Sequence, residues 1–352
     1  MPVEQRTQSD VLGLIERVKA KPLRFRDEQI TMAHGAGGKA TLALVEGLLA
    51  PAFKMADLDD AARIGELAVT TDSFVVKPIR FPGGSIGELA VNGTVNDLAV
   101  SGARPLALTL SLVLEEGLPA DELREEVDAI ARAAEAAGVA IVAGDTKVVE
   151  RGHCDSMYIT TTGIGTLDSR ASLSPASLRP GDRILVSGPI GDHGTAIMLA
   201  RGEFELDAEV ASDTQSLWPA VDALLGAAGS ELRCVRDATR GGLASVVNEL
   251  ARSSGVGIVV READVPVKDE VVGACELLGI DPMYVANEGR LLAFVGPEAA
   301  DRALSALAAV CRGAAEIGEV TADQPGLVIV ETAFGGRRVM DLLVGDPLPR
   351  IC

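Results

Sequence analysis

The sequence predicts a two-domain protein of the α/β class, with mixed α+β character. Apolar residues make up 47% of its 352 residues, which is enough for two hydrophobic cores of ordinary size. Segments with strand patterns and helix patterns alternate in both halves of the chain. A stretch rich in Ser, Pro and Asp, residues 168–188, separates the halves and indicates a domain boundary.

The first half predicts an N-terminal domain over residues 31–167. Residues 1–30 are predicted to be a short extension, because Pro22 and charged residues interrupt the helical pattern of residues 10–20. The strands predicted in the domain are 67–76, 106–114, 139–149 and 156–167, and the predicted helices are 86–102 and 120–138.

The second half predicts a C-terminal domain over residues 168–340, followed by a flexible tail over 341–352. Strand and helix patterns alternate again in segments such as 183–199, 234–260 and 269–295. The tail contains Pro347 and Pro349, which disfavour regular structure, and it ends at Cys352. No chain beyond Cys352 constrains it, so we interpret this thiol as accessible for reaction.

Charge, cysteine usage and hydropathy exclude several classes of protein. The net charge of −19 disfavours binding to nucleic acid or to anionic lipid. The five cysteines are odd in number and lack C-x-x-C spacing, and the three histidines share no ligand spacing, so neither a disulfide framework nor a zinc site is predicted. No apolar run approaches the ~18 residues of a membrane span. We expect a cytoplasmic protein.

Five stretches near strand ends carry glycines, carboxylate or amide side chains, or both: 34–41, 70–74, 91–103, 143–149 and 236–242. Glycines let backbone amides approach phosphates, although neither a P-loop nor a dinucleotide-binding motif is present. Each aspartate alone is better explained as a cap or turn residue, whereas their recurrence as a set favours a Mg²⁺–phosphate site. The candidate metal ligands are Asp72, Asp97, Asp145 and Asp237, with Asp59 and Asp60 as further members.

Two other residues are candidates for proton transfer. Lys147 follows an apolar strand and could contact a phosphate or act as a base, or it could be an ordinary surface lysine. Glu288 precedes a strand in the sequence Asn287–Glu288–Gly289–Arg290, where a carboxylate could accept a proton or simply be solvated.

Residues 70–117, 143–152, 236–251 and 287–295, together with the final Pro349–Arg350–Ile351–Cys352, resemble the HypE family of hydrogenase maturation proteins. That family is similar to aminoimidazole ribonucleotide synthetase (PurM), selenophosphate synthetase and thiamine monophosphate kinase. The resemblance covers about residues 30–352, with the glycine-rich loop at 34–39 matching only loosely. It implies a two-domain PurM-like fold, a homodimer formed by N-terminal domains, and ATP with Mg²⁺ as cofactors.

The resemblance also implies roles for individual residues. Cys352 would carry the substrate, and Lys147 and Glu288 would assist proton removal. Together with the glycine-containing stretches, it points to two sets of contacts. The metal contacts would come from Asp60, Asp72, Asp97, Asp145 and Asp237, and the nucleotide contacts from Asn92, Asn96, Gly144, Thr146, Lys147 and Asp237.

The activity implied by the resemblance is dehydration of an S-carbamoyl group on Cys352 to a thiocyanate, at the expense of ATP. A HypF-like carbamoyltransferase would load the cysteine. The HypC–HypD complex would receive the cyano group for the iron centre of [NiFe]-hydrogenase. Two alternatives stay open: another ATP-dependent enzyme of the superfamily that acts on a free amide or phosphate acceptor, and a nucleotide-binding scaffold for maturation partners.

Overall fold

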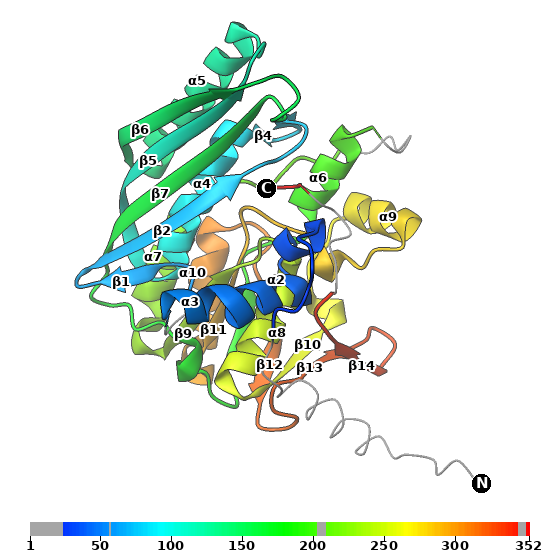
Figure 1. Cartoon of the computed structure of the whole chain (residues 1–352). Helices are drawn as coiled ribbons and strands as arrows, with labels where there is room; N and C mark the ends of the chain where they lie inside the picture. Colours follow the sequence, from blue (N-terminus) through cyan, green and yellow to red (C-terminus); the bar gives the residue numbers. More distant parts are fainter. Residues whose placement is uncertain (1–23, 56–57, 203–208, 344–349) are drawn as a thin grey trace.

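The computed structural model describes residues 24–55, 58–202, 209–343 and 350–352. Its strands form a five-stranded sheet from residues 62–167, a seven-stranded sheet from residues 183–340 and a short two-stranded hairpin. Figure 1 shows the two large sheets in separate parts of the molecule, each with helices packed on it. This arrangement confirms the mixed α/β class that the sequence predicts.

The five-stranded sheet has the strand order β1, β2, β7, β5, β6, in which only β5 and β6 run parallel. Helices α4 (Ile86–Val100) and α5 (Ala120–Ala137) lie on one face of it (Figure 1). Almost every residue of α4 is buried, because this helix packs between the sheet and the rest of the protein. The strand bounds are β1 (Ala62–Ile64), β2 (Leu67–Phe74), β5 (Ala103–Glu115), β6 (Ala140–Val149) and β7 (Met157–Leu167).

The other face of the five-stranded sheet is open in the described chain. Thr71 and Ser73 lie on this face, because they alternate with side chains of β2 that point toward α4. The edge strand β6 is exposed along almost its whole length, and Val142 and Val148 are 62% and 66% exposed. An open sheet face beside an exposed apolar edge strand is typical of a surface that another chain covers.

The seven-stranded sheet is the middle layer of the second half. Its strand order is β14, β13, β10, β12, β8, β11, β9. Ile184 and Phe294 pack on the side of α8 (Gly242–Ser254), whereas Leu185 and Ala293 pack on the side of α7 (Trp218–Ala228) and α10 (Ala300–Val310). The strand bounds are β8 (Arg183–Val186), β9 (Leu232–Asp237), β10 (Gly257–Arg261), β11 (Leu291–Val295), β12 (Ala315–Thr321), β13 (Val328–Glu331) and β14 (Arg337–Met340).

Two helices from the second half pack on the core of the first. Residues of α6 (Asp192–Ala200) and α9 (Asp269–Leu278) share a hydrophobic cluster with Phe74, Leu89 and Ile351. The remaining elements are short: α2 (Lys39–Leu44), a π-helical turn η2 (Val45–Leu49), α3 (Ala50–Phe53), β3 (Arg80–Phe81), β4 (Gly84–Ser85), and the 3-10 turns η1 (Met32–Gly35), η3 (Pro175–Ser177), η4 (Gly229–Glu231), η5 (Glu262–Asp264), η6 (Pro282–Tyr284) and η7 (Pro297–Ala299).

The strands and helices predicted for the first half agree with the observed bounds to within three residues. The predicted helical segment at 10–20 lies outside the described residues. The connection from 168 to 182, where we predict the domain boundary, contains only the turn η3 and joins the two large sheets. Within the described ranges, none of the helices has both the length and the apolar character needed to span a bilayer.

Candidate functional site

Three predicted metal ligands converge where the two halves of the chain meet. Asp72 comes from β2, Asp97 from α4, and Asp237 is the last residue of β9. Helix α4 contacts both β2 and β9, which brings the three carboxylates together although they are far apart in sequence. The hydroxyl of Thr70 donates a hydrogen bond to Oδ2 of Asp97 at 2.8 Å, which orients that carboxylate.

Burial raises the pKa values of all three carboxylates, and neighbouring negative charges add to this effect for Asp97 and Asp237. Burial, followed by the charges of Asp237, Asp60 and Asp72, raises the pKa of Asp97 well above its usual range. Burial and the charge of Asp60 raise the pKa of Asp237 to about 8. Burial also raises the pKa of Asp72, although the guanidinium of Arg240 opposes this effect. A buried group of like charges is an environment that a bound cation stabilises.

The fit of this site to Mg²⁺ depends on what completes the coordination shell. The described residues hold no group of three His, Cys, Asp or Glu side chains arranged to bind a metal. Asp60 and Asp59 both form ion pairs with Arg236, so their carboxylates already have a partner within the chain. Mg²⁺ commonly takes one or two carboxylates and fills the other positions with phosphate oxygens and water. The carboxylate set therefore fits a Mg²⁺ ion that arrives with a polyphosphate.

Glu288 joins this set from the loop before β11. Burial, followed by the charges of Asp213, Asp237 and Asp72, raises the pKa of Glu288 well above its usual range. Its Oε1 atom is buried and has no hydrogen-bond partner among the described residues. A buried carboxylate with an available oxygen and a raised pKa has the properties of a proton acceptor.

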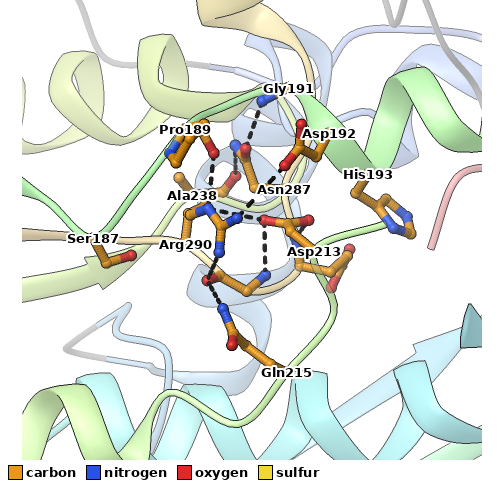
Figure 2. A network of polar contacts seen from close by, with 12 residues as sticks. Ser187, Pro189, Gly191, Asp192, His193, Asp213, Gln215, Ala238, Asn287 and Arg290 are labelled. Atoms are coloured by element: carbon orange, nitrogen blue, oxygen red, sulfur yellow. Dashed lines mark hydrogen bonds and ion pairs between the residues drawn. The ribbon is translucent and has the colours of Figure 1, made fainter. Parts of the chain in front are cut away.

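A polar network holds the main chain around Glu288 (Figure 2). Asp213 accepts hydrogen bonds from the amides of Glu288 and Gly289, at 3.0 and 3.3 Å. Arg290 donates from Nη1 to the carbonyl of Gly289 at 3.0 Å, and Asn287 donates to the backbone just after β9 at 2.8 Å. These bonds fix the backbone on both sides of Glu288, so its side chain projects from a rigid segment.

Asn92 and Asn96 point from α4 toward the segment that leads into α7. Asn96 donates from Nδ2 to the carbonyls of Gln215 and Glu288, at 3.0 and 3.1 Å, and its Oδ1 accepts from the amide before α7 at 2.7 Å. Asn92 donates to the hydroxyl of Thr214 at 3.3 Å. Both asparagines support the backbone next to Glu288 in this structure, and their contact with a nucleotide stays a prediction.

The glycine-rich loop at 34–38 packs against the turn that begins α8. Arg240 donates to the carbonyl of Gly35 at 2.9 Å, and Ser245 donates to the carbonyl of Gly37 at 3.3 Å. Gly241 has a φ of 74°, and a Cβ atom there would lie 2.0 Å from Oγ of Ser245, so the turn requires glycine. Because Arg240 also acts on the carboxylate of Asp72, both loops lie beside the candidate metal site.

The predicted site residues of β6, residues 144–147, lie apart from the carboxylates of their own chain. Strands β7 and β5 separate β6 from β2, which puts β6 about 14 Å from β2 at the usual strand spacing. Asp145 is in register with Ser73 across these strands, and both lie on the open face of the sheet. Asp72 lies on the opposite face, next to Gly93 of α4.

On that open face, Asp145 and Lys147 contact each other. Nζ of Lys147 lies 2.5 Å from Oδ2 of Asp145, and this hydrogen bond lowers the pKa of Asp145. Gly144 and Thr146 are exposed on the same strand. Within one chain, the structure therefore does not bring these four residues to Asp72, Asp97 and Asp237.

The C-terminal residues 350–352, which we call the terminal tripeptide, are docked on the protein. Their carbonyl oxygens each accept a hydrogen bond: Ile351 from Nε2 of His193 at 2.7 Å, and Arg350 and Cys352 from backbone amides just after β2, both at 3.2 Å. The side chain of Ile351 is 3% exposed. The sequence predicts a flexible tail over 341–352. Residues 344–349 lie outside the described residues, whereas the tripeptide is held because it buries Ile351.

Three residues of this region were not singled out by the sequence patterns. Asp213 lies in an irregular segment far from Glu288 in sequence, so no pattern marks it. Arg240 belongs to the glycine-containing stretch 236–242, which is itself a usable signal. His193 stands at a strand-to-helix junction after Gly191, and a polar side chain at such a junction is a usable signal of a site.

Replacing Asp237 by asparagine should raise the melting temperature of the metal-free protein by several degrees at pH 8, and by less at pH 5. Burial raises the pKa of Asp237 to about 8 in the folded chain, against an ordinary value of 3.8, so the folded state holds an extra proton between these values. The free energy of unfolding of the wild type therefore falls as the pH rises through this window. Thermal melts at both pH values, with and without Mg²⁺, measure the effect.

Asp168 provides the control for this experiment. Hydrogen bonds from Arg170 lower the pKa of Asp168 to about 2, so its stabilising contribution is complete above the unfolded value and constant from pH 5 to pH 8. Asp168→Asn should therefore lower the melting temperature equally at both pH values. A gain in melting temperature from Asp237→Asn that is the same at both pH values would contradict a raised pKa of Asp237 in the folded protein.

Comparison with known proteins identifies the family. Models of the AIR synthase related protein match residues 58–167 with the N-terminal domain and residues 179–331 with the C-terminal domain. Carbamoyl dehydratase HypE of Rhodobacter capsulatus is 48% identical over 341 residues, covering 94% of this chain and 100% of that protein. The chain belongs to the HypE family. HypE of Azotobacter vinelandii is 49% identical over 339 residues, covering 94% and 99%.

Solved HypE structures share the fold. A HypE–HypF complex aligns with a TM-score of 0.82 at 44% identity, covering 86% of this chain and 100% of that chain. HypE in complex with ATP aligns with a TM-score of 0.77 at 44% identity, covering 92% and 100%. These matches confirm the predicted PurM-like fold, and the enzyme names of the HypE relatives confirm the prediction of an enzyme.

Proposed function

We propose that this HypE family member catalyses the ATP-dependent dehydration of a carbamoyl group on the sulfur of its own Cys352, which becomes S-cyanocysteine. The observation that carries the proposal is the docked terminal tripeptide. His193 binds the carbonyl of Ile351 and also contacts Ser212, and the next residue, Asp213, holds the backbone of Glu288. The terminal cysteine and the candidate base are thus connected by consecutive contacts, which an incidental tail would not need.

The chemistry requires an amide oxygen to leave. Transfer of the γ-phosphoryl group of ATP to the carbamoyl oxygen makes that oxygen part of a good leaving group. Elimination then breaks the carbon–oxygen bond, releases phosphate and forms the carbon–nitrogen triple bond as the two N–H protons depart. Glu288 is our candidate for accepting a proton, with Lys147 as the second candidate. Because the substrate is attached to the enzyme, effective concentration replaces binding affinity.

The nucleotide and its metal would lie at the carboxylate set. Asp72, Asp97 and Asp237 would hold Mg²⁺ together with phosphate oxygens, and the metal would neutralise charge during phosphoryl transfer. The glycine-rich loop at 34–38 and the turn before α8 would offer backbone amides to the phosphates. A HypE relative crystallised in complex with ATP supports a nucleotide site in this family.

We place Asp145 and Lys147 at the same centre through a second copy of the chain. In their own protomer these residues lie on the open face, away from Asp72. A homodimer formed by packing two open faces would bury the exposed strand β6 and could carry its residues to the carboxylates of the partner. The exposure of β6 along almost its whole length supports this assignment.

The proposed reaction also requires two partner activities. A HypF-like carbamoyltransferase would load Cys352, and a relative crystallised as a HypE–HypF complex supports this partner. A HypC–HypD complex would take the cyano group to provide the cyanide ligands of the [NiFe]-hydrogenase iron. The thiol of Cys352 must stay reduced to be loaded, which fits the reducing environment of the cytoplasm.

Mass spectrometry of the C-terminal peptide tests the proposal. After incubation with the carbamoylating partner, the peptide should gain one carbamoyl group, and addition of ATP with Mg²⁺ should then remove the mass of one water. ADP should form in step with this loss. A carbamoylated peptide whose mass stays unchanged while ADP accumulates would exclude dehydration as the use of ATP.

A further inference from the structure

Helix α6 presents two hydrogen-bond donors to the terminal tripeptide, one near each end of the helix. His193 lies in its first turn and donates from Nε2 to the carbonyl of Ile351 at 2.7 Å. Arg201, which caps its C-terminus, donates from Nη2 to the carbonyl of Arg350 at 2.8 Å. Figure 1 shows the C-terminus beside this helix.

His193 is held in the form that can make its bond. Nδ1 lies 2.8 Å from Oγ of Ser212, and the amide of Thr214 donates to that same Oγ at 3.2 Å. Ser212 can therefore direct its hydroxyl proton to Nδ1, which leaves the ring proton on Nε2 facing Ile351. The imidazole is fully buried, and Phe81 packs edge-on against it with ring centroids 5.5 Å apart.

Other contacts of the tripeptide reinforce this placement. Asp155 pairs with both Arg350 and Lys77, which follows β2. Arg201 also donates from Nε to the carbonyl of Lys77 at 3.0 Å, so one side chain ties the tripeptide to the chain beneath it. Ile351 fills a position in the hydrophobic cluster that includes residues of α6.

We propose that α6 is the dock of the terminal tripeptide and that His193 is a positioning residue, which sets how far Cys352 reaches toward the catalytic centre. The inference rests on the proposed function for its catalytic meaning. A hydrogen bond from a buried imidazole to the carbonyl next to Cys352 restricts the terminal residue far more than a contact earlier in the tail. Arg201 holds the neighbouring carbonyl, so the two donors determine the direction of the tripeptide.

The dock also connects the tail to the loop before β11 that carries Glu288. Ser212 orients His193, and the adjacent Asp213 accepts the amides of Glu288 and Gly289. Figure 2 shows His193 near Asp213, which belongs to the network around Arg290. When the tripeptide leaves the dock, the hydrogen bond between His193 and Ile351 is lost. Docking of the tail and the backbone geometry at Glu288 therefore both depend on the segment that contains Ser212 and Asp213.

The test measures how fast N-ethylmaleimide alkylates Cys352 in the full-length protein, by mass spectrometry of the C-terminal peptide. The thiol of Cys352 is half-buried in the dock, so the reagent reacts faster when the tripeptide leaves, and the rate rises with the fraction that is undocked. His193→Phe removes the donor but keeps a ring of similar size, and it should raise the rate about tenfold, the effect of losing one buried hydrogen bond. His193→Gln, which keeps an N–H donor, should restore most of the protection.

Arg201→Ala should also raise the alkylation rate, and it carries the test alone if His193→Phe does not fold. Arg302→Ala is the matched control, because Arg302 likewise donates to two backbone carbonyls but lies on α10, away from the tail. The buried Cys234 should react at the wild-type rate in every variant, which excludes general unfolding.

Unchanged alkylation of Cys352 in folded His193→Phe, or in Arg201→Ala, would overturn the proposal. The measurement requires neither ATP nor a carbamoyl group. Its failure would therefore leave the proposed dehydration untouched, and a failure of the dehydration would leave the dock in place.

Discussion

Replacing Cys352 by alanine should abolish the ATP turnover that the carbamoylating partner elicits. The proposed substrate exists only as a group on this sulfur, so a chain without the thiol has nothing to activate. ADP release, followed in the presence of the HypF-like partner and its carbamoyl donor, should fall to the rate measured without the partner. The change removes only the sulfur atom at the chain end. Ile351, which is buried in the wild type, should therefore keep its position in the variant.

Cys311→Ala provides the matched control for this variant. Cys311 is a half-buried cysteine just after α10, outside the carboxylate set and the dock. Its replacement should leave partner-dependent ADP release at the wild-type rate. If Cys352→Ala turned over ATP as fast as the wild type with the partner present, the tail would be incidental and a free acceptor would have to be sought.

Changing Glu288 to glutamine, or Lys147 to methionine, should each lower the rate of water loss by about 10²–10⁴-fold, the usual contribution of a positioned acid or base. Docking of the tail should persist in both variants, because neither side chain holds the tripeptide. Since burial raises the pKa of Glu288, the wild-type rate should rise with pH as this carboxyl loses its proton. The glutamine variant should lose that rise.

Mixing the two inactive variants tests where Lys147 acts. If each centre combines Glu288 of one protomer with Lys147 of its partner, half of the protomers in a randomised mixture form mixed dimers with one intact centre each, and about a quarter of the wild-type activity returns. Native mass spectrometry of the mixture, with one variant isotope-labelled, demonstrates subunit exchange independently of activity. No recovery despite demonstrated exchange would mean that both residues serve the same chain.

Much of the fold could be predicted because its elements are locally encoded. The predicted bounds of helix α4 and strand β7 agree with the observed bounds to within two residues, since many small and apolar residues mark the buried helix and β-branched residues mark the strand. The pairing of β6 with β5 in parallel, and the placement of α6 on the first core, depend on contacts between residues far apart in sequence. No local pattern contains that information.

The candidate site divides in the same way. The recurrence of aspartate in polar or glycine-containing stretches near element ends is enough to select Asp72, Asp97 and Asp237, which the fold brings together. The same pattern selected Asp145, which the register places on the other face of its sheet. Strand alternation sends neighbouring residues to opposite faces, so membership of a motif does not determine which face a side chain occupies.

By itself, the sequence determined the class of the protein, the residue types of the site and the presence of a terminal cysteine. Only the tertiary structure decided which carboxylates lie close together and that Arg236 forms an ion pair with Asp60. It also decided that His193 and Arg201 donate hydrogen bonds to the terminal tripeptide. The physical reason is that charge interaction and burial depend on distance in space. These residues become neighbours only when the two halves of the chain pack together.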